Sequence, residues 1–219
     1  MDDLALLTHS DLFSAFDEAG LHAVVEASTL VRCDRGDAVF GEDDTAEELY
    51  VVRSGRVAIG RRSPDGRESL VALMEAGDLF GELPLFDGLP RSASARALEP
   101  SELLCIPYAP VKAAIDRRPE LLWDVVELLA GRMRATDSAL ADAVFLDVTG
   151  RTAKRLLELA GDADEFQLPI TQEELAGLVG ASRERVNKSI AAFARLGWIE
   201  QVDRRYRILE RERLAQRAR

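Results

Sequence analysis

Hydrophobic positions between residues 119 and 147 recur with a heptad spacing. Charged and small residues fill most of the other positions of this segment. The repeat positions are Leu122, Val126, Leu129, Met133, Thr136, Leu140 and Ala143. A stripe this narrow is typical of a coiled-coil seam, whereas a helix packed inside its own domain carries a wider apolar face. The pattern therefore predicts one long helix that pairs with a copy of itself.

Thr136 is the polar residue on this seam, and Asp137 follows it. A polar group on a seam costs stability unless it finds a partner, which makes Thr136 a candidate ligand contact. The alternative is a hydroxyl group that bonds to the backbone of its own helix. The heptad pattern leaves both interpretations open.

Short hydrophobic segments separated by turn signals follow a stretch of short amphipathic helices at residues 3–28. Between residues 29 and 107 these segments read TLVRC, ELYVVR, RVAIGRR, SLVALM and ELLCIP. The Ser-Pro-Asp-Gly turn signal at residues 63–66 is typical of a hairpin. The motif RGDAVFGE at residues 35–42 returns as AGDLFGE at residues 76–82, which indicates an internal repeat. Many short strands at regular spacing predict a β-roll or jelly roll.

The C-terminal segment predicts a helix-turn-helix motif with a β-hairpin wing at residues 198–208. A capping box at residues 171–174 begins one helix, and residues 183–196 predict a second helix closed by Gly197. The spacing within the second helix assigns Val186, Ile190 and Phe193 to the core. It leaves the following side chains exposed at the N-terminal end, where such a helix enters the major groove: Arg183, Glu184, Asn187 and Lys188.

Charge is distributed unevenly along the chain of 219 residues. The net charge is −11, but residues 1–146 carry 14 basic against 27 acidic side chains, and residues 147–219 carry 14 against 12. Screening in salt makes the local field matter more than the total, so only the C-terminal third is suited to nucleic acid. No apolar run is long enough to cross a membrane, and the first residues are acidic. We therefore expect a cytoplasmic protein without a membrane partner.

The two cysteines, Cys33 and Cys105, are far apart and lie in strand-like surroundings. They lack CxxC spacing, and only His9 and His22 could add nitrogen ligands. We expect reduced core residues and no metal, haem or iron-sulfur cluster.

Residues 80–97 interrupt the strand rhythm with the sequence FGELPLFDGLPRSASARA. Residues 82–86 can form one helical turn whose free N–H groups, together with Arg91 and a hydroxyl group, suit a phosphate. The carboxylate of Glu82 would repel a phosphate unless it accepts a hydrogen bond from a sugar hydroxyl. The alternative is a plain salt bridge between Glu82 and Arg91.

The sequences FGEL at residues 80–83 and PRSA at residues 90–93 closely resemble the phosphate-binding cassette of cyclic-nucleotide-binding domains. These domains occur in the cyclic-AMP receptor protein (CRP/FNR) family of bacterial regulators, and the resemblance extends through FLDVTGR at residues 145–151 to the helix-turn-helix motif. It implies an α+β protein in three parts. These parts are a β-roll (jelly-roll) cyclic-nucleotide-binding domain at residues 1–118, a dimerisation helix at residues 119–147, and a winged helix-turn-helix domain at residues 148–219.

The resemblance also implies a role for each matching residue. Glu82 would hold the ribose 2′-hydroxyl, and Arg91 with Ser92 would hold the cyclic phosphate. Gly81 and Leu83 would contribute cassette backbone. Thr136 would meet the purine amino group across the dimer seam, and Asp137 stands where the best-known members have a serine from the opposite subunit, which leaves the choice between cyclic AMP and cyclic GMP open.

The same resemblance implies a homodimeric, allosteric transcription regulator of inverted-repeat operators in double-stranded DNA, with RNA polymerase as a partner. Arg183, Glu184 and Lys188 carry the chemistry to read guanine and cytosine edges, although the alternative is a solvated charged face. Thr171, Gln172, Ser182 and Asn187 complete the expected DNA-binding set. Two alternatives remain: a constitutive or differently liganded regulator, and an enzyme acting on a phosphodiester. The enzyme would need a metal cluster or a base near Arg91, and the cassette supplies only Glu82.

Overall fold

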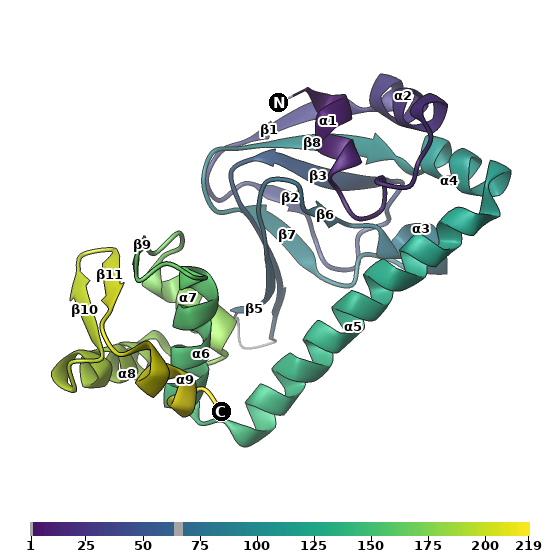
Figure 1. Ribbon diagram of the computed structural model, residues 1–219. Coiled ribbons are helices and arrows are strands. Elements are labelled where there is room, and N and C mark those ends of the chain that lie inside the picture. The colour runs from purple at the N-terminus through teal and green to yellow at the C-terminus, as the bar shows by residue number, and fades with distance from the viewer. Residues whose placement is uncertain (1, 64–67) are drawn as a thin grey trace. The chain divides into compact units, whose positions relative to one another are not determined.

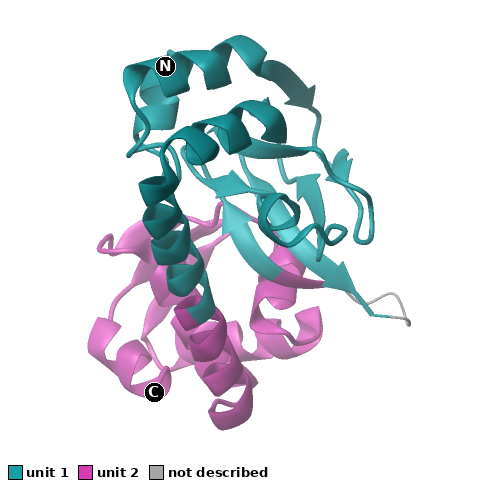
Figure 2. Cartoon of the chain, turned by 90° about the vertical axis from the view of Figure 1, so that its right-hand side faces the viewer, with its two compact units in different colours: residues 1–67, 71–133 teal, residues 68–70, 134–219 magenta. Residues whose placement is uncertain are grey.

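The computed structural model describes residues 2–63 and 68–219 (Figure 1). The expected hairpin turn at residues 63–66 lies largely outside the described residues. Contacts divide the chain into two compact units (Figure 2). Unit 1 comprises Met1–Arg67 and Val71–Met133, and unit 2 comprises Glu68–Leu70 and Arg134–Arg219. The long helix crosses from one unit to the other, as its own residues show.

Two sheets form the roll among the described residues, which confirms the predicted fold class. One sheet has the strand order β1-β8-β3-β6, and the other has the order β2-β7-β4-β5. The first contains β1 (Thr29–Cys33), β8 (Ser101–Pro107), β3 (Glu48–Ser54) and β6 (Leu79–Phe80). The second contains β2 (Ala38–Phe40), β7 (Ser94–Ala97), β4 (Val57–Arg62) and β5 (Glu68–Met74). The internal repeat coincides with β2 and β6, and each of these short strands runs into a glycine.

Among the described residues, two hydrophobic clusters form the core of unit 1. One lies between the sheets and includes Tyr50, Val57, Phe80 and Leu103. The other joins the first sheet to helices α1 (Asp3–Thr8), α2 (Glu18–Ala27) and α4 (Tyr108–Arg117) and to the start of the long helix. The apolar face predicted for residues 3–28 is buried there except for Val25, which is half-buried; the buried residues are Leu6, Leu7, Leu12, Phe13, Phe16, Leu21 and Val24. Burial of this apolar surface is the main stabilising term of the roll.

The long helix α5 (Leu122–Phe145) follows a short 3-10 turn, η1 (Pro119–Leu121). It carries two apolar stripes rather than one. Val125 and Leu128 are buried in the core of unit 1, a stripe that the heptad reading missed. Most of the predicted seam is exposed, with Leu122 45%, Val126 53%, Met133 67% and Leu140 62% exposed. Leu129 is the exception among the large seam residues, because it is half-buried and packs against the core of unit 1. Trp123, beside the seam, is 76% exposed.

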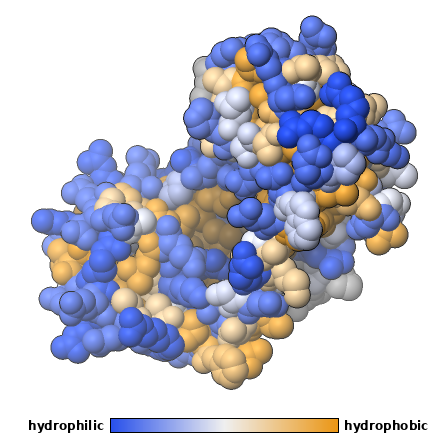
Figure 3. Space-filling model, turned by 45° about the vertical axis from the view of Figure 1, so that its right-hand side comes forward, coloured by the Kyte–Doolittle hydropathy of each residue, from blue (hydrophilic) through white to orange (hydrophobic). Residues whose placement is uncertain are grey.

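The space-filling view shows exposed hydrophobic residues, in orange, among hydrophilic residues, in blue, on this face of the molecule (Figure 3). A run of exposed large hydrophobic side chains on one helix is a liability in water unless a partner covers it.

The described part of unit 2 contains a winged helix-turn-helix, as predicted. Its helices are α6 (Val148–Ala160), α7 (Gln172–Val179), α8 (Arg183–Arg195) and α9 (Arg211–Arg217). The strands β10 (Ile199–Val202), β11 (Arg205–Ile208) and β9 (Glu165–Gln167) form an antiparallel sheet in that order. The expected core residues of α8 are buried, and Trp198 stacks on Phe193 with ring centroids 5.7 Å apart.

Helix α9 was not predicted from the sequence. The sequence places Arg211, Arg213, Arg217 and Arg219 in this tail without deciding whether they contact phosphates or the protein's own surface. Arg211 donates to the carbonyl oxygens of Gly161 and Ala163, and Arg217 pairs with Asp147 at the start of α6. These two arginines therefore cover the protein's own surface, whereas Arg213 and Arg219 are exposed.

Candidate functional site

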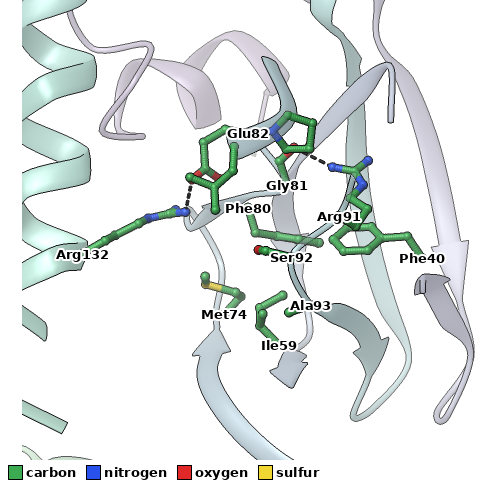
Figure 4. A pocket seen from close by; sticks show the side chains of 12 residues that line it. Phe40, Ile59, Met74, Phe80, Gly81, Glu82, Arg91, Ser92, Ala93 and Arg132 are labelled. Carbon is green, nitrogen blue, oxygen red and sulfur yellow. Dashed lines mark hydrogen bonds and ion pairs between the residues drawn. The ribbon is translucent and has the colours of Figure 1, made fainter. Parts of the chain in front are cut away.

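A pocket in unit 1 brings the cassette together with an arginine of α5 (Figure 4). The roll supplies an apolar wall, and the cassette supplies the polar groups. The lining residues are Phe40, Ile59, Met74, Phe80, Gly81, Glu82, Leu83, Pro84, Arg91, Ser92, Ala93 and Arg132. A concave site with an apolar wall and a few convergent polar groups is typical of a small-molecule site.

The backbone of the cassette is built as the sequence predicted. After β6, Gly81 adopts a φ of 81°, and a Cβ atom at this position would lie 2.6 Å from Nη1 of Arg91. Only glycine combines that conformation with so close an approach. Helix α3 (Leu83–Asp87) follows, with Glu82 at its N-cap and Pro84 in its first turn. Leu83 and Ser92 are exposed at the pocket.

Arg91 is held by main-chain and side-chain acceptors while its side chain is only 1% exposed. Nη1 donates to the carbonyl oxygen of Gly81 and to the Tyr108 hydroxyl, and Nη2 donates to the carbonyl oxygen of Glu48 at 2.7 Å. The guanidinium carbon lies 4.1 Å from the centre of the Phe40 ring, which adds a cation–π contact. Nε is buried, and residues 2–63 and 68–219 offer it no hydrogen-bond partner.

Tyr108 contributes a neutral hydroxyl to this arrangement. Burial raises the pKa of Tyr108 to about 12, although the positive charge of Arg91 acts in the opposite direction. The hydroxyl therefore stays protonated at neutral pH. It donates to the carbonyl oxygen of Gly81 at 2.6 Å and accepts from Arg91.

Glu82 is completely buried and pairs with Arg132 of α5. Arg132 also donates to the carbonyl oxygen of Leu79. The second carboxylate oxygen of Glu82, Oε2, is buried and has no hydrogen-bond partner in the described part of the chain. The alternative of a Glu82–Arg91 salt bridge is therefore wrong, because Glu82 pairs with Arg132 and Arg91 faces Glu48.

Arg132 is a site residue that the sequence reasoning missed. It precedes Thr136 by four residues, and residues four apart share one face of a helix. That spacing was a usable signal. Thr136 and Asp137 themselves are exposed on α5 and do not line the pocket among the described residues.

The N-terminal end of α8 presents three of the four side chains expected to read DNA. Arg183, Glu184 and Lys188 are exposed, and Glu184 pairs with Lys188 at 2.7 Å. The hydrogen bond from Lys188 holds the pKa of the Glu184 carboxyl below its usual range. Asn187 is half-buried rather than exposed as expected, and its Oδ1 atom is buried, whereas its contact with DNA stays a prediction.

Hydroxyl groups cap the N-termini of α7 and α8, the two helices of the helix-turn-helix. The Thr171 hydroxyl and the Glu174 carboxylate form the predicted capping box of α7, which Gln172 begins. The Ser182 hydroxyl accepts from the backbone N–H of Arg185 at the start of α8. Each cap satisfies N–H groups that have no partner within the helix.

The cysteines are free thiols, with Cys33 buried and Cys105 half-buried. In the part of the chain that the structure describes, no three side chains of His, Cys, Asp or Glu are grouped so as to hold a metal ion. Within the same residues, no helix has the length and apolar character that crossing a bilayer requires.

Family comparisons match both parts of this architecture. The family model of the cyclic nucleotide-binding domain matches residues 30–118, which include the whole cassette. The model of the Crp-like helix-turn-helix domain matches residues 150–217. The first match supports a cyclic nucleotide as the ligand of the pocket, and the second supports DNA binding by unit 2.

Known relatives agree with these matches. The chain is 41% identical to a CRP-like cAMP-activated global transcriptional regulator of Mycobacterium tuberculosis over 100% of both chains. The structure of the Thermus thermophilus catabolite activator protein is similar, with 33% identity, a TM-score of 0.54, and coverage of 95% of this chain and 98% of that one.

A further solved structure is that of the c-di-GMP-responsive global regulator CLP of Xanthomonas campestris. It is similar with 26% identity, a TM-score of 0.76, and coverage of 88% of this chain and 99% of that one. The matching domains and relatives are transcription regulators rather than enzymes. The chain therefore belongs to the CRP/FNR family of DNA-binding transcription regulators.

Proposed function

We propose that this regulator responds to cyclic AMP and reads inverted-repeat operators as a homodimer in the cytoplasm, together with RNA polymerase. The observation that supports this most directly is a pair of buried atoms at one pocket, Oε2 of Glu82 and Nε of Arg91, that have no hydrogen-bond partner among the residues that the structure describes. Buried polar groups are costly without a partner. A ribose hydroxyl would donate to the first atom, and a phosphate oxygen would accept from the second.

The proposed ligand contacts combine that complementarity at Glu82 and Arg91 with the roles that the family resemblance implies for the other residues. Glu82 accepts from the ribose 2′-hydroxyl, Arg91 and Ser92 bind the cyclic phosphate, and backbone groups of Gly81 and Leu83 complete the cassette. Thr136 meets the purine amino group across the dimer seam, and Asp137 stands in the place of the serine that other family members supply from the opposite subunit. No metal or haem takes part. In this proposal residues 1–118 bind the ligand, residues 119–147 pair, and residues 148–219 bind DNA.

Pairing through α5 gives the exposed stripe a partner. Two copies of one helix with a heptad of hydrophobic side chains bury those side chains against each other. A two-fold dimer presents its two α8 helices to half-sites about one helical turn apart, so the operator has the same symmetry. Cyclic AMP then acts as an allosteric ligand by binding one arrangement of the subunits more tightly than the other.

Calorimetric titration tests the ligand. Cyclic AMP is expected to bind at one site per subunit, and operator affinity measured in the same buffer is expected to change with it.

A specific observation favours a second candidate: Asp137 carries a negative charge where the family pattern has serine, and the CLP relative responds to c-di-GMP. Tighter binding of cyclic GMP or c-di-GMP than of cyclic AMP would replace the proposed ligand.

Replacing Arg183 by alanine is expected to weaken operator binding and to remove the preference for guanine at a single base position. A guanidinium can donate two parallel hydrogen bonds to guanine O6 and N7, and losing them costs about 1–3 kcal/mol at that position. Binding to operators substituted one base pair at a time measures this. A loss of the same size on every sequence would mean that Arg183 contacts only phosphate.

A further inference from the structure

Each pocket arginine already faces a carboxylate of the protein. Arg132 pairs with Glu82, and Nη2 of Arg91 lies 3.3 Å from Oε1 of Glu48. Glu82 is itself a proposed ligand contact, but Glu48 does not line the pocket among the described residues. The guanidinium proposed to bind the phosphate therefore carries a negative neighbour that has no other role in the site.

Glu48 is fixed beside Arg91 by its place in the sheet. It is the first residue of β3, where it pairs in register with Pro107 of β8, and its side chain is 35% exposed. The Tyr50 hydroxyl donates to Oε1 of Glu48 at 3.2 Å. Burial raises the pKa of Tyr50, so this hydroxyl remains a donor and holds the carboxylate in place.

The position of Arg91 does not depend on that carboxylate. The carbonyl oxygens of Gly81 and Glu48 accept from its two terminal nitrogens, and the Phe40 ring lies under the guanidinium plane. These groups remain when the Glu48 side chain changes. The contribution of the carboxylate to the site is therefore mainly its charge.

We propose that the Glu48 carboxylate competes with the ligand phosphate for Arg91 and so lowers the affinity of the pocket for anionic ligands. The inference rests on the proposed function, because it assumes a cyclic nucleotide at this pocket. Glu48 acts through Arg91 and does not touch the ligand. A phosphate that approaches Nε of Arg91 meets a guanidinium whose charge is partly neutralised by Glu48, and it is repelled by the same carboxylate.

Glu48→Gln tests the proposal because it removes the charge and keeps the shape. Cyclic AMP is expected to bind about three- to tenfold more tightly, since partial exposure weakens the repulsion that is lost. The gain is expected to shrink as salt rises from about 50 to 500 mM. Adenosine, which has no phosphate, is expected to bind the variant and the wild type equally. Competition against a fluorescent cyclic nucleotide measures both ligands.

Glu47→Gln is the matched control. Glu47 is the exposed neighbour of Glu48, and only its backbone carbonyl takes part in a described contact, with the N–H of Tyr108. Its loss removes the same formal charge from the same strand end. The control variant is expected to bind cyclic AMP within about twofold of the wild type, because an exposed charge farther from the guanidinium is well screened.

Three results would overturn the inference: unchanged or weaker cyclic AMP binding by Glu48→Gln, an equal gain for adenosine, or an equal gain in Glu47→Gln.

Glu48→Asp provides a second variant, because a shorter side chain withdraws the carboxylate from Nη2 and is expected to give a smaller gain. A wild-type protein that fails to bind cyclic AMP would remove the proposed function and the inference together. Tight wild-type binding with no gain in the variants would remove only the inference.

Discussion

Replacing Arg91 by lysine is expected to weaken cyclic AMP binding roughly 100-fold, or about 2.7 kcal/mol. The guanidinium bonds the carbonyl oxygens of Gly81 and Glu48 and the Tyr108 hydroxyl, and it still has Nε for a ligand. A lysine ammonium is a compact point charge with three donors and no planar fork. It cannot satisfy these buried acceptors and a phosphate at once. Calorimetric titration of the variant with cyclic AMP gives the measurement.

The interior position of Arg91 makes a stability check part of this experiment. Losing the hydrogen bonds from the guanidinium to the carbonyl oxygens of Gly81 and Glu48 costs folding free energy as well as affinity, although the Tyr108 hydroxyl still donates to Gly81. The melting temperature is therefore expected to fall, and titration must be done well below it. Arg62→Lys, at the exposed end of β4, is the matched control and is expected to bind normally. Normal cyclic AMP affinity in a folded Arg91→Lys variant would remove Arg91 from the site.

Replacing Leu140 by glutamate is expected to raise the dimer dissociation constant at least about 100-fold. Leu140 is 62% exposed in the single chain, and in a paired α5 it would lie on the seam. Each dimer would then bury two carboxylates of like charge in an apolar contact, at a cost of several kcal/mol. Sedimentation over a range of concentrations measures the dimer, and binding to a full inverted repeat is expected to fall with it.

Ala141→Glu is the control for Leu140→Glu. Ala141 is also exposed on α5 but lies outside the heptad positions, so its substitution adds the same charge without reaching the seam. Alanine and glutamate are both good helix formers, which keeps α5 itself intact. An undisturbed dimer in the Leu140→Glu variant would mean that another surface pairs the subunits. The exposed stripe of α5 would then need a different partner.

The features that the sequence predicted well depend on neighbours in the chain. Gly81 and Pro84 define the turn and the first turn of α3 locally, and Thr171 with Glu174 defines the start of α7. The heptad of α5 repeats over several helical turns. Each of these patterns depends on residues within a single turn or helix, and tertiary contacts do not override them here.

The features that the sequence could not supply depend on contacts between distant residues. Arg132 reaches Glu82 across 50 positions, and Arg91 meets Glu48 across 43. Glu82 is close to Arg91 in the sequence and was therefore the carboxylate considered as its partner. Distance along the chain does not predict that β3 places Glu48 next to Arg91 instead. The strands β2, β6 and β7 are two to four residues long, too short for an alternating pattern to stand out.

The second stripe of α5 was missed for a related reason. Val125 and Leu128 lie three residues apart, which is also a normal step within a heptad pattern. One helix therefore carries two apolar faces, one for the core of unit 1 and one that the single chain leaves exposed. Only the packed structure separates them, because both faces use the same kinds of side chain.

The distribution of aromatic side chains gives the protein a built-in optical reporter in each unit. The chain has two tryptophans: Trp123 lies exposed on the part of α5 in unit 1, and Trp198 stacks on Phe193 in unit 2. Indole emission shifts to shorter wavelength when water leaves the ring. Replacing one tryptophan by phenylalanine would therefore leave a single fluorescent indole. Changes in the environment of α5 and of the helix-turn-helix could then be followed separately without attaching a dye.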